Sequence, residues 1–149
     1  MIRKAKLEDV KKIHHLIMAS AKANELLPRS LHEIYEDLRD FFVYEEDGKI
    51  IGVSAIHVCW EDLAEIRSLA VTEEYRMKGI GKILVQRCLE DAKDIGISRV
   101  FALTYHPDFF EKMGFKRVDK SKLPQKIWGD CLKCPKFPEC NEVAVIKKL

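Results

Sequence analysis

Two glycines at the start of a long amphipathic segment carry the clearest chemical signal in the sequence. Gly79 and Gly81 follow a strand-like run, residues 65–71, and open a predicted helix. The first turn of a helix has free backbone N–H groups and the positive end of the helix dipole, and glycine lets a bulky anion approach the backbone. Three basic side chains add charge here, those of Arg76, Lys78 and Lys82. The pattern predicts a phosphate or pyrophosphate site, with a tight strand-to-helix turn as the alternative.

Two common phosphate-binding motifs do not fit this segment. A P-loop needs Gly-Lys-Ser/Thr, which is missing here. The dinucleotide fingerprint needs three glycines after the first strand of a parallel fold. The segment is therefore neither a P-loop nor a dinucleotide-binding fingerprint.

The pattern of helices and strands around Gly79 and Gly81 predicts a mixed α/β domain. Helices are expected over residues 7–21, 30–39, 79–95 and 109–113, and strands over 41–45, 50–58, 65–71, 99–104, 115–118 and 142–147. Asp47-Gly48 between the first two strands is a strong hairpin signal, and Ser30-x-x-Glu33 has the form of a capping box. The helix over 79–95 has one apolar stripe, made by Ile80, Ile83, Leu84, Cys88, Ala92 and Ile95.

Composition sets the broad class of protein. The 149 residues are the length of one domain, so we expect a single domain over 1–149. The net charge of +2 gives no electrostatic footprint for nucleic acid or an anionic membrane. No apolar run approaches the roughly 20 residues of a membrane span, and the N-terminus does not resemble a signal peptide. The expectation is a soluble, cytoplasmic protein.

Several segments resemble those of the GNAT acyl-CoA N-acyltransferases. Arg76-x-x-Gly79-x-Gly81 after "EIRSLAV" looks like motif A of that family, and "VYEEDGKIIGVSAI" looks like its β2–β3 hairpin. "LEDVKKIHHLI" is similar to the family's first helix, and "HPDFFEKMGFKRV" to its late "FYEKLGF" segment. The resemblance covers nearly the whole chain. It implies the GNAT fold, an α/β (α+β) fold with a mixed central sheet flanked by helices.

The resemblance also implies the cosubstrate, acetyl-CoA, and no metal for catalysis. The pantetheine would pair with the main chain of Leu69, Ala70 and Val71 like an extra strand. The pyrophosphate would lie on the segment made of Arg76, Met77, Lys78, Gly79, Ile80, Gly81 and Lys82, chiefly on its backbone amides.

A narrower resemblance points to the acceptor. "AEIRSLAV", "RVFALTYHPDFFEKMGF" and "LPQKIWGDCLKCPKFPEC" are similar to the acetyltransferase domain of N-acetylglutamate synthases, most of all to the short forms without an amino-acid-kinase domain. Those enzymes acetylate the α-amine of glutamate, the first step of arginine biosynthesis. The partner implied is a small amino acid, and by analogy with GNAT dimers a homodimer is expected.

Acetyl transfer needs a base, a stabilised oxyanion and an acid for the leaving thiolate. Glu65 is the candidate base, directly or through a water, and its alternatives are a solvated carboxylate or a partner for Arg67. Arg67 is the candidate clamp for a substrate carboxylate, or an ordinary surface arginine. Both share one face if the strand alternates regularly. By resemblance to the family's bulged fourth strand, the amide of Leu69 would donate to the oxyanion.

The general acid is harder to assign. Many GNAT enzymes have tyrosine where this chain has Phe110. Tyr105 is the candidate acid, its alternative being a partly buried aromatic at a strand end. No tyrosine would be needed if a proton moved directly within the reaction intermediate, or if coenzyme A left as a thiolate. Thr104 is expected either to hydrogen-bond the substrate or to cap the strand.

The cysteine-rich segment near the C-terminus has partial metal-ligand spacing. Structural zinc generally has four ligands, and here three are clustered, Cys131, Cys134 and Cys140. His57, Cys59 or His106 could supply a fourth in space; otherwise these are reduced thiols. The same segment is expected to border the acceptor site, with Lys126 as a contact for a carboxylate.

Two other functions stay open. One is a GNAT enzyme for a different amine, which would not need an α-carboxylate on its acceptor. The other is a non-catalytic acyl-CoA sensor, which would bind acetyl-CoA without turnover.

Overall fold

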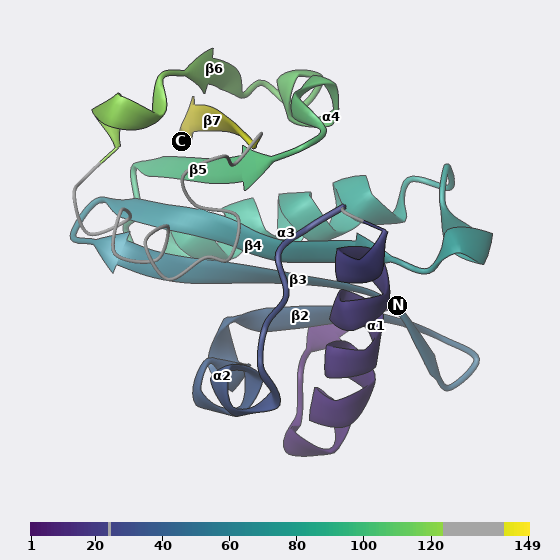
Figure 1. Cartoon of the computed structure of the whole chain (residues 1–149). Helices are drawn as coiled ribbons and strands as arrows, with labels where there is room; N and C mark the ends of the chain where they lie inside the picture. The colour runs from purple at the N-terminus through teal and green to yellow at the C-terminus, as the bar shows by residue number, and fades with distance from the viewer. Residues whose placement is uncertain (24, 124–141) are drawn as a thin grey trace.

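A mixed β-sheet forms the frame of the molecule (Figure 1). The computed structural model describes residues 1–23, 25–123 and 142–149, and within them seven strands lie in the order β1-β2-β3-β4-β5-β7-β6. Their bounds are β1 (Ile2–Lys4), β2 (Phe41–Glu46), β3 (Lys49–Trp60), β4 (Leu63–Val71), β5 (Arg99–Thr104), β6 (Lys116–Val118) and β7 (Val143–Lys148). β4 and β5 are parallel, and the other neighbours are antiparallel.

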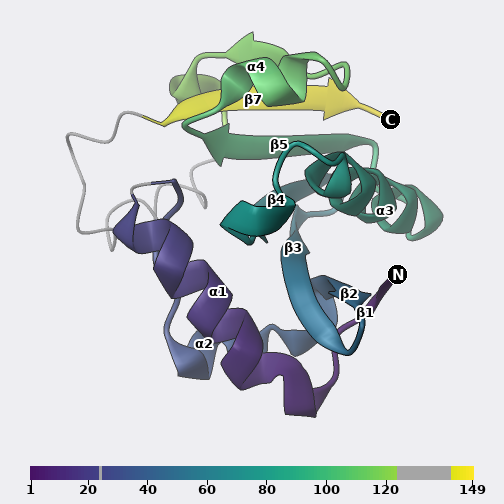
Figure 2. The same ribbon diagram turned by 90° about the vertical axis from the view of Figure 1, so that its right-hand side faces the viewer.

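Helices cover both faces of this sheet, as Figure 2 shows. Their bounds are α1 (Val10–Lys22), α2 (Leu31–Glu36), α3 (Ile80–Asp94) and α4 (Pro107–Glu111), with 3-10 turns at Leu7–Asp9, Leu38–Asp40, Glu73–Tyr75 and Lys120–Lys122. α1 and α2 pack on one face, where α1 contacts β3 and β4, and α3 packs on the other. α4 contacts β6 and β7. These layers confirm the predicted fold class.

The apolar stripe of α3 is confirmed only in part. Leu84, Cys88 and Ala92 are fully buried against the sheet, whereas Ile83 is 39% and Ile95 60% exposed. Ile83 lies at the edge of the buried face, and Ile95 comes after the last helical residue. The stripe instead includes Val85, which is fully buried.

Local turn chemistry follows the sequence closely. The Ser30 hydroxyl accepts from the N–H of Glu33 at 3.1 Å, and the Glu33 carboxylate accepts from the N–H of Ser30 at 3.2 Å. This reciprocal pair confirms the capping box. Asp47 and Gly48 have φ of 51° and 76°, as a type I′ hairpin turn requires.

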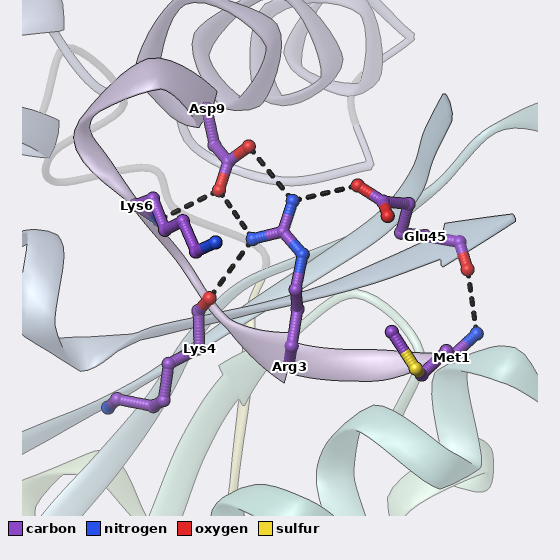
Figure 3. A network of polar contacts seen from close by, with 6 residues as sticks. All are labelled: Met1, Arg3, Lys4, Lys6, Asp9 and Glu45. Carbon is purple, nitrogen blue, oxygen red and sulfur yellow. Dashed lines mark hydrogen bonds and ion pairs between the residues drawn. The ribbon is translucent and has the colours of Figure 1, made fainter. Parts of the chain in front are cut away.

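The first strand was not predicted from the sequence, and the first helix begins later than expected. Figure 3 shows what fixes this end: the Arg3 guanidinium donates to both carboxylate oxygens of Asp9, at 2.7 and 3.1 Å, and to Glu45 at 2.8 Å. Asp9 also accepts from the backbone N–H of Lys6 at 2.7 Å. A three-residue strand has no periodicity of its own, and long-range polar contacts hold it in place.

In the described part of the chain, no helix is both long enough and apolar enough to cross a membrane.

Candidate active site

A cleft opens where β4 and β5 part. The two strands pair only from Leu63 with Arg99 to Glu65 with Phe101, and beyond this they diverge. The cleft has a volume of about 660 Å³. Its walls are β4 from Glu65 to Val71, the beginning of α3, the end of β5 with the turn into α4, and the connection between α1 and α2. Sequence-predicted residues from three separate elements therefore meet in one place.

A bulge interrupts β4 inside the cleft. Ala55 pairs with Arg67 and Val53 with Ala70, so Ser68 and Leu69 together oppose the single residue Ser54. Ser68 has a φ of 54°, which is uncommon for a residue with a side chain. A bulge leaves the extra residue unpaired in the ladder and redirects its neighbours. The irregularity lies where the resemblance to the family's bulged fourth strand placed it, and Leu69 lines the cleft.

The beginning of α3 forms another wall of the cleft. Gly79 is the N-cap, with a φ of 81°, and its carbonyl accepts the first helical bond from Ile83 at 3.1 Å. The N–H groups of the first turn, from Ile80 to Lys82, have no helical partner and can bind an anion. Met77 also has positive φ, 66°. Such backbone conformations are typical of anion-binding loops.

The basic side chains around the beginning of α3 differ in the partners that they contact. Arg76 donates through Nε to the carbonyl of Val71 at 3.1 Å, and its Nη1 lies 3.0 Å from Oε2 of Glu25. The Lys78 ammonium is 5.2 Å from the ring centroid of Tyr75. Lys82 is exposed and lines the cleft. Lys82 therefore offers positive charge to the cleft directly, whereas the charge of Arg76 is matched by Glu25.

Glu65 and Arg67 share one face of β4, as the sequence predicted. Nε of Arg67 donates to Oε1 of Glu65 at 2.6 Å, and each side chain is only 11% exposed. The alternative of an ordinary surface arginine is therefore wrong. Glu65 is thus a partner for Arg67, which was one of the alternatives for Glu65. The pair also places a carboxylate and a guanidinium together in the cleft.

Sequence reasoning missed Arg29, which also lines the cleft. Arg29 follows Pro28 and directly precedes the Ser30 cap of α2, and its Nη1 lies 3.3 Å from Oε2 of Glu33. Arg29 and Arg67 line a second, small recess as well, next to Ser68. The motif around the capping box was visible in the sequence, but only the packing of α2 on the sheet brings Arg29 to this site.

The end of β5 supplies the third wall. Tyr105 lines the cleft and is partly buried, so the candidate acid is in the same cavity as the candidate base. The Thr104 hydroxyl accepts from the N–H of His106 at 2.9 Å, which is the capping role that the sequence left open. Phe110, at the family's tyrosine position, is 4% exposed and packs edge-on against Phe109 and Phe115 with ring centroids 5.1 Å apart.

Some predicted residues lie outside the described residues. These are Lys126, Cys131, Cys134 and Cys140. His57, one suggested fourth ligand for the cysteines, has its Nδ1 2.6 Å from Oδ2 of Asp40.

Comparison with known proteins agrees with this geometry. Residues 8–115 match the model of the acetyltransferase (GNAT) family. An uncharacterized N-acetyltransferase of Chlorobaculum tepidum is 44% identical over 99% of this chain and 96% of its own. An amino-acid acetyltransferase of Mycobacterium tuberculosis is 35% identical over 87% of this chain and 76% of its own.

The solved structures similar to this chain include complexes with coenzyme A. An M. tuberculosis protein with CoA has a TM-score of 0.86 and 28% identity, covering 100% of this chain and 99% of its own. The N-acetylglutamate synthase of Neisseria gonorrhoeae, with CoA and N-acetyl-glutamate, has a TM-score of 0.91 and 29% identity, covering 100% of this chain and 35% of its own. GNAT acetyltransferases need acetyl-CoA and no metal. The bulged strand, the glycine-capped helix and these matches show that the chain belongs to the GNAT family and is an acetyltransferase.

Proposed function

We propose that this acetyltransferase transfers the acetyl group of acetyl-CoA to the α-amine of L-glutamate, by direct transfer in a ternary complex. The observation that carries the proposal is the presence of two guanidinium groups, those of Arg29 and Arg67, in the cleft that also holds the β4 bulge and the start of α3. A guanidinium recognises a carboxylate through paired hydrogen bonds. Glutamate has two carboxylates, and a clamp of two arginines suits it.

The cosubstrate half of the proposal uses the helix start and β4. We place the pyrophosphate on the N–H groups between Lys78 and Lys82, because the helix dipole favours an anion there. The pantetheine would run along β4 from Leu69 to Val71, where β5 has diverged. The Val71 carbonyl already accepts from Arg76, but a carbonyl oxygen has a second lone pair for the ligand.

The acceptor half of the proposal assigns a role to four groups. Glu65 would take the proton from the acceptor's ammonium, so that the amine nitrogen can attack the thioester carbon. The N–H of Leu69 would donate to the oxyanion as it forms. As the C–S bond breaks, the nitrogen loses its second proton to solvent, and Tyr105 would protonate the leaving thiolate. Arg67 donates to Glu65 and, in this proposal, also holds a carboxylate of the acceptor.

The test is the rate of CoA release from acetyl-CoA with a panel of acceptors: L-glutamate, L-glutamine, L-aspartate, a polyamine and a peptide N-terminus. The proposal expects the highest kcat/KM for L-glutamate, and a product whose acetyl group is on the α-nitrogen by mass spectrometry. A higher kcat/KM for the polyamine or the peptide would reject it. CoA binding without release for any acceptor would instead favour the sensor.

If L-glutamate is the acceptor, we predict that the enzyme acts in arginine biosynthesis. We also predict a cytoplasmic location and a homodimer.

A further inference from the structure

We propose that Glu25, through its ion pair with Arg76, makes the binding of acetyl-CoA and the binding of the acceptor depend on each other. The inference rests on the proposed function for the identity of the acceptor, L-glutamate. Glu25 acts through Arg76 on one side and through the chain that leads to Arg29 on the other, and not through contact with either substrate. It is therefore a positioning residue.

The ion pair joins two walls of the cleft that are far apart in the sequence. Oε2 of Glu25 lies 3.0 Å from Nη1 of Arg76, and both residues line the cleft. Glu25 belongs to the connection between α1 and α2, whereas Arg76 lies between the 3-10 turn Glu73–Tyr75 and α3. The pair thus links the wall that carries Arg29 to the wall on which we place the pyrophosphate.

Arg76 is held at a second point and keeps a donor for an anion. Its Nε donates to the carbonyl of Val71, at the end of β4, at 3.1 Å. In the parts of the chain that the structure describes, Nη2 of Arg76 has no polar partner. A guanidinium has five N–H donors in a fixed plane, so Arg76 can keep Val71 and Glu25 while Nη2 donates to the pyrophosphate. The bound pyrophosphate would then fix the guanidinium in place.

Glu25 is also tied to the residues that lead to Arg29. Its backbone N–H donates to the carbonyl of Ser20 on α1 at 3.0 Å. The next residue, Leu26, is 9% exposed and packs in the core between α1, α2 and the sheet. Arg29 follows in the same short segment and lines the cleft. A restraint on Glu25 is therefore a restraint on the segment that carries the Arg29 guanidinium.

These contacts give the coupling its sign. Pyrophosphate that fixes Arg76 also fixes the Glu25 carboxylate, so part of the ordering of residues 25–29 is complete before the acceptor binds. Ordering a binding segment in advance raises affinity, and linkage requires each substrate to raise the affinity for the other by the same factor. The side chains of Arg76 and Glu25 are 38% and 30% exposed. We expect a factor of about three, which is the size typical of a partly exposed ion pair.

The experiment measures the Kd of CoA by titration calorimetry, without and with saturating L-glutamate. CoA carries no acetyl group, so no transfer occurs and the measurement is at equilibrium. In the wild type, L-glutamate should lower the Kd of CoA about threefold. In Glu25→Gln, the two Kd values should be equal. CoA alone should bind Glu25→Gln at least as tightly as the wild type, because a carboxylate close to the anion is removed; a general structural defect would weaken binding instead.

The matched control is Glu74→Gln. This variant removes the same charge two positions before Arg76, but Glu74 is exposed and is not among the residues that line the cleft. The threefold difference should therefore remain.

A double variant tests the route through Arg76. Arg76→Ala should abolish the difference between the two Kd values by itself, which keeps the test informative if Glu25→Gln does not fold. Adding Glu25→Gln to Arg76→Ala should then change neither Kd. A further change in the double variant would mean that Glu25 acts by another route, and the proposal would be wrong.

The outcomes separate this inference from the proposed function. A threefold difference that persists in Glu25→Gln overturns the coupling, and so does a wild type in which L-glutamate leaves the Kd of CoA unchanged while remaining the preferred acceptor. If the acceptor panel selects another amine, the proposed function fails, and the same titration with that amine still tests the coupling. A protein that acetylates no amine overturns both.

Discussion

The carboxylate of Glu65 and the guanidinium of Arg67 are joined by a 2.6 Å hydrogen bond in a cleft wall where both side chains are almost buried. A buried ion pair is costly to break, because removing one partner leaves the other charge uncompensated. The pair therefore holds a carboxylate and a guanidinium side by side in the cleft before any substrate arrives. This arrangement is the core of the proposed acceptor site.

Arg67→Lys should raise the acceptor KM about tenfold, equivalent to about 1.4 kcal/mol, because lysine keeps the charge but loses the paired hydrogen bonds of the guanidinium. The KM for acetyl-CoA should stay unchanged. Initial rates of CoA release at saturating acetyl-CoA measure both constants. The matched control is Arg99→Lys, whose ion pair with Asp62 is about 40% exposed and outside the cleft. An equal effect of both variants on the acceptor KM would contradict the clamp.

Gly79→Ala should weaken acetyl-CoA binding more than Gly81→Ala does. Gly79 has positive φ, which costs a residue with a side chain about 1 kcal/mol, whereas a Cβ at Gly81 would only touch Phe109 at an ordinary 3.5 Å. The Gly79 variant shifts the loop whose N–H groups face the anion. Titration calorimetry with CoA gives the two dissociation constants, and thermal melts give the stability. Equal dissociation constants for both variants would count against the role of Gly79.

Asp9→Asn should lower the free energy of unfolding by about 2 kcal/mol at pH 7, because Asp9 accepts charge-assisted bonds from Arg3 in a nearly buried site. The Arg3 guanidinium holds the pKa of Asp9 below its ordinary value. The contribution of ionised Asp9 is therefore complete above about pH 4, the unfolded value, and is lost as the pH falls through the lower pKa of the folded state.

Urea denaturation at pH 7 and at pH 3 checks this. The difference in stability between wild type and Asp9→Asn should be largest at pH 7 and smaller at pH 3. Asp62→Asn is the control, since its exposed pair with Arg99 should contribute less than about 1 kcal/mol. A difference that does not depend on pH would show that the ion pair is not its source.

The Cys88 thiol should resist alkylation in the folded protein at pH 8. Cys88 is fully buried on α3, and burial raises the pKa of its thiol to about 12, so almost no reactive thiolate forms. Peptide mass spectrometry after iodoacetamide treatment measures the modified fraction with and without urea. Modification should need urea; fast labelling without it would mean that α3 opens readily from the sheet.

Much of the fold was predictable because its signals are local. The Asp47-Gly48 turn and the Ser30 capping box each depend on residues within a few positions, and the helix after Gly79 has a clear apolar period. The strand Ile2–Lys4 was not predictable, since three residues show no period and the strand is held by Arg3 and its distant partner Glu45.

The site was predictable only where the chemistry lies on one segment. Glu65 and Arg67 are two residues apart, so strand alternation was enough to pair them. Arg29 reaches the cleft because α2 packs on the sheet, and His57 meets Asp40 because β2 and β3 pair. Such contacts join residues far apart in the sequence, which a single sequence does not display. Only the family resemblance predicted a bulge in this strand near Leu69, and the structure places it at Ser68 and Leu69.

The most direct test of the account compares L-glutamate with γ-aminobutyrate, the same molecule without its α-carboxylate. The measurement is kcat/KM from CoA release at saturating acetyl-CoA, with the acetylated product identified by mass spectrometry. Recognition of the α-carboxylate predicts a kcat/KM for L-glutamate at least about a hundredfold higher than for γ-aminobutyrate, because each lost charge-assisted contact costs about 1.5–3 kcal/mol. Equal values for the two acceptors would contradict recognition of an α-amino acid through its carboxylate.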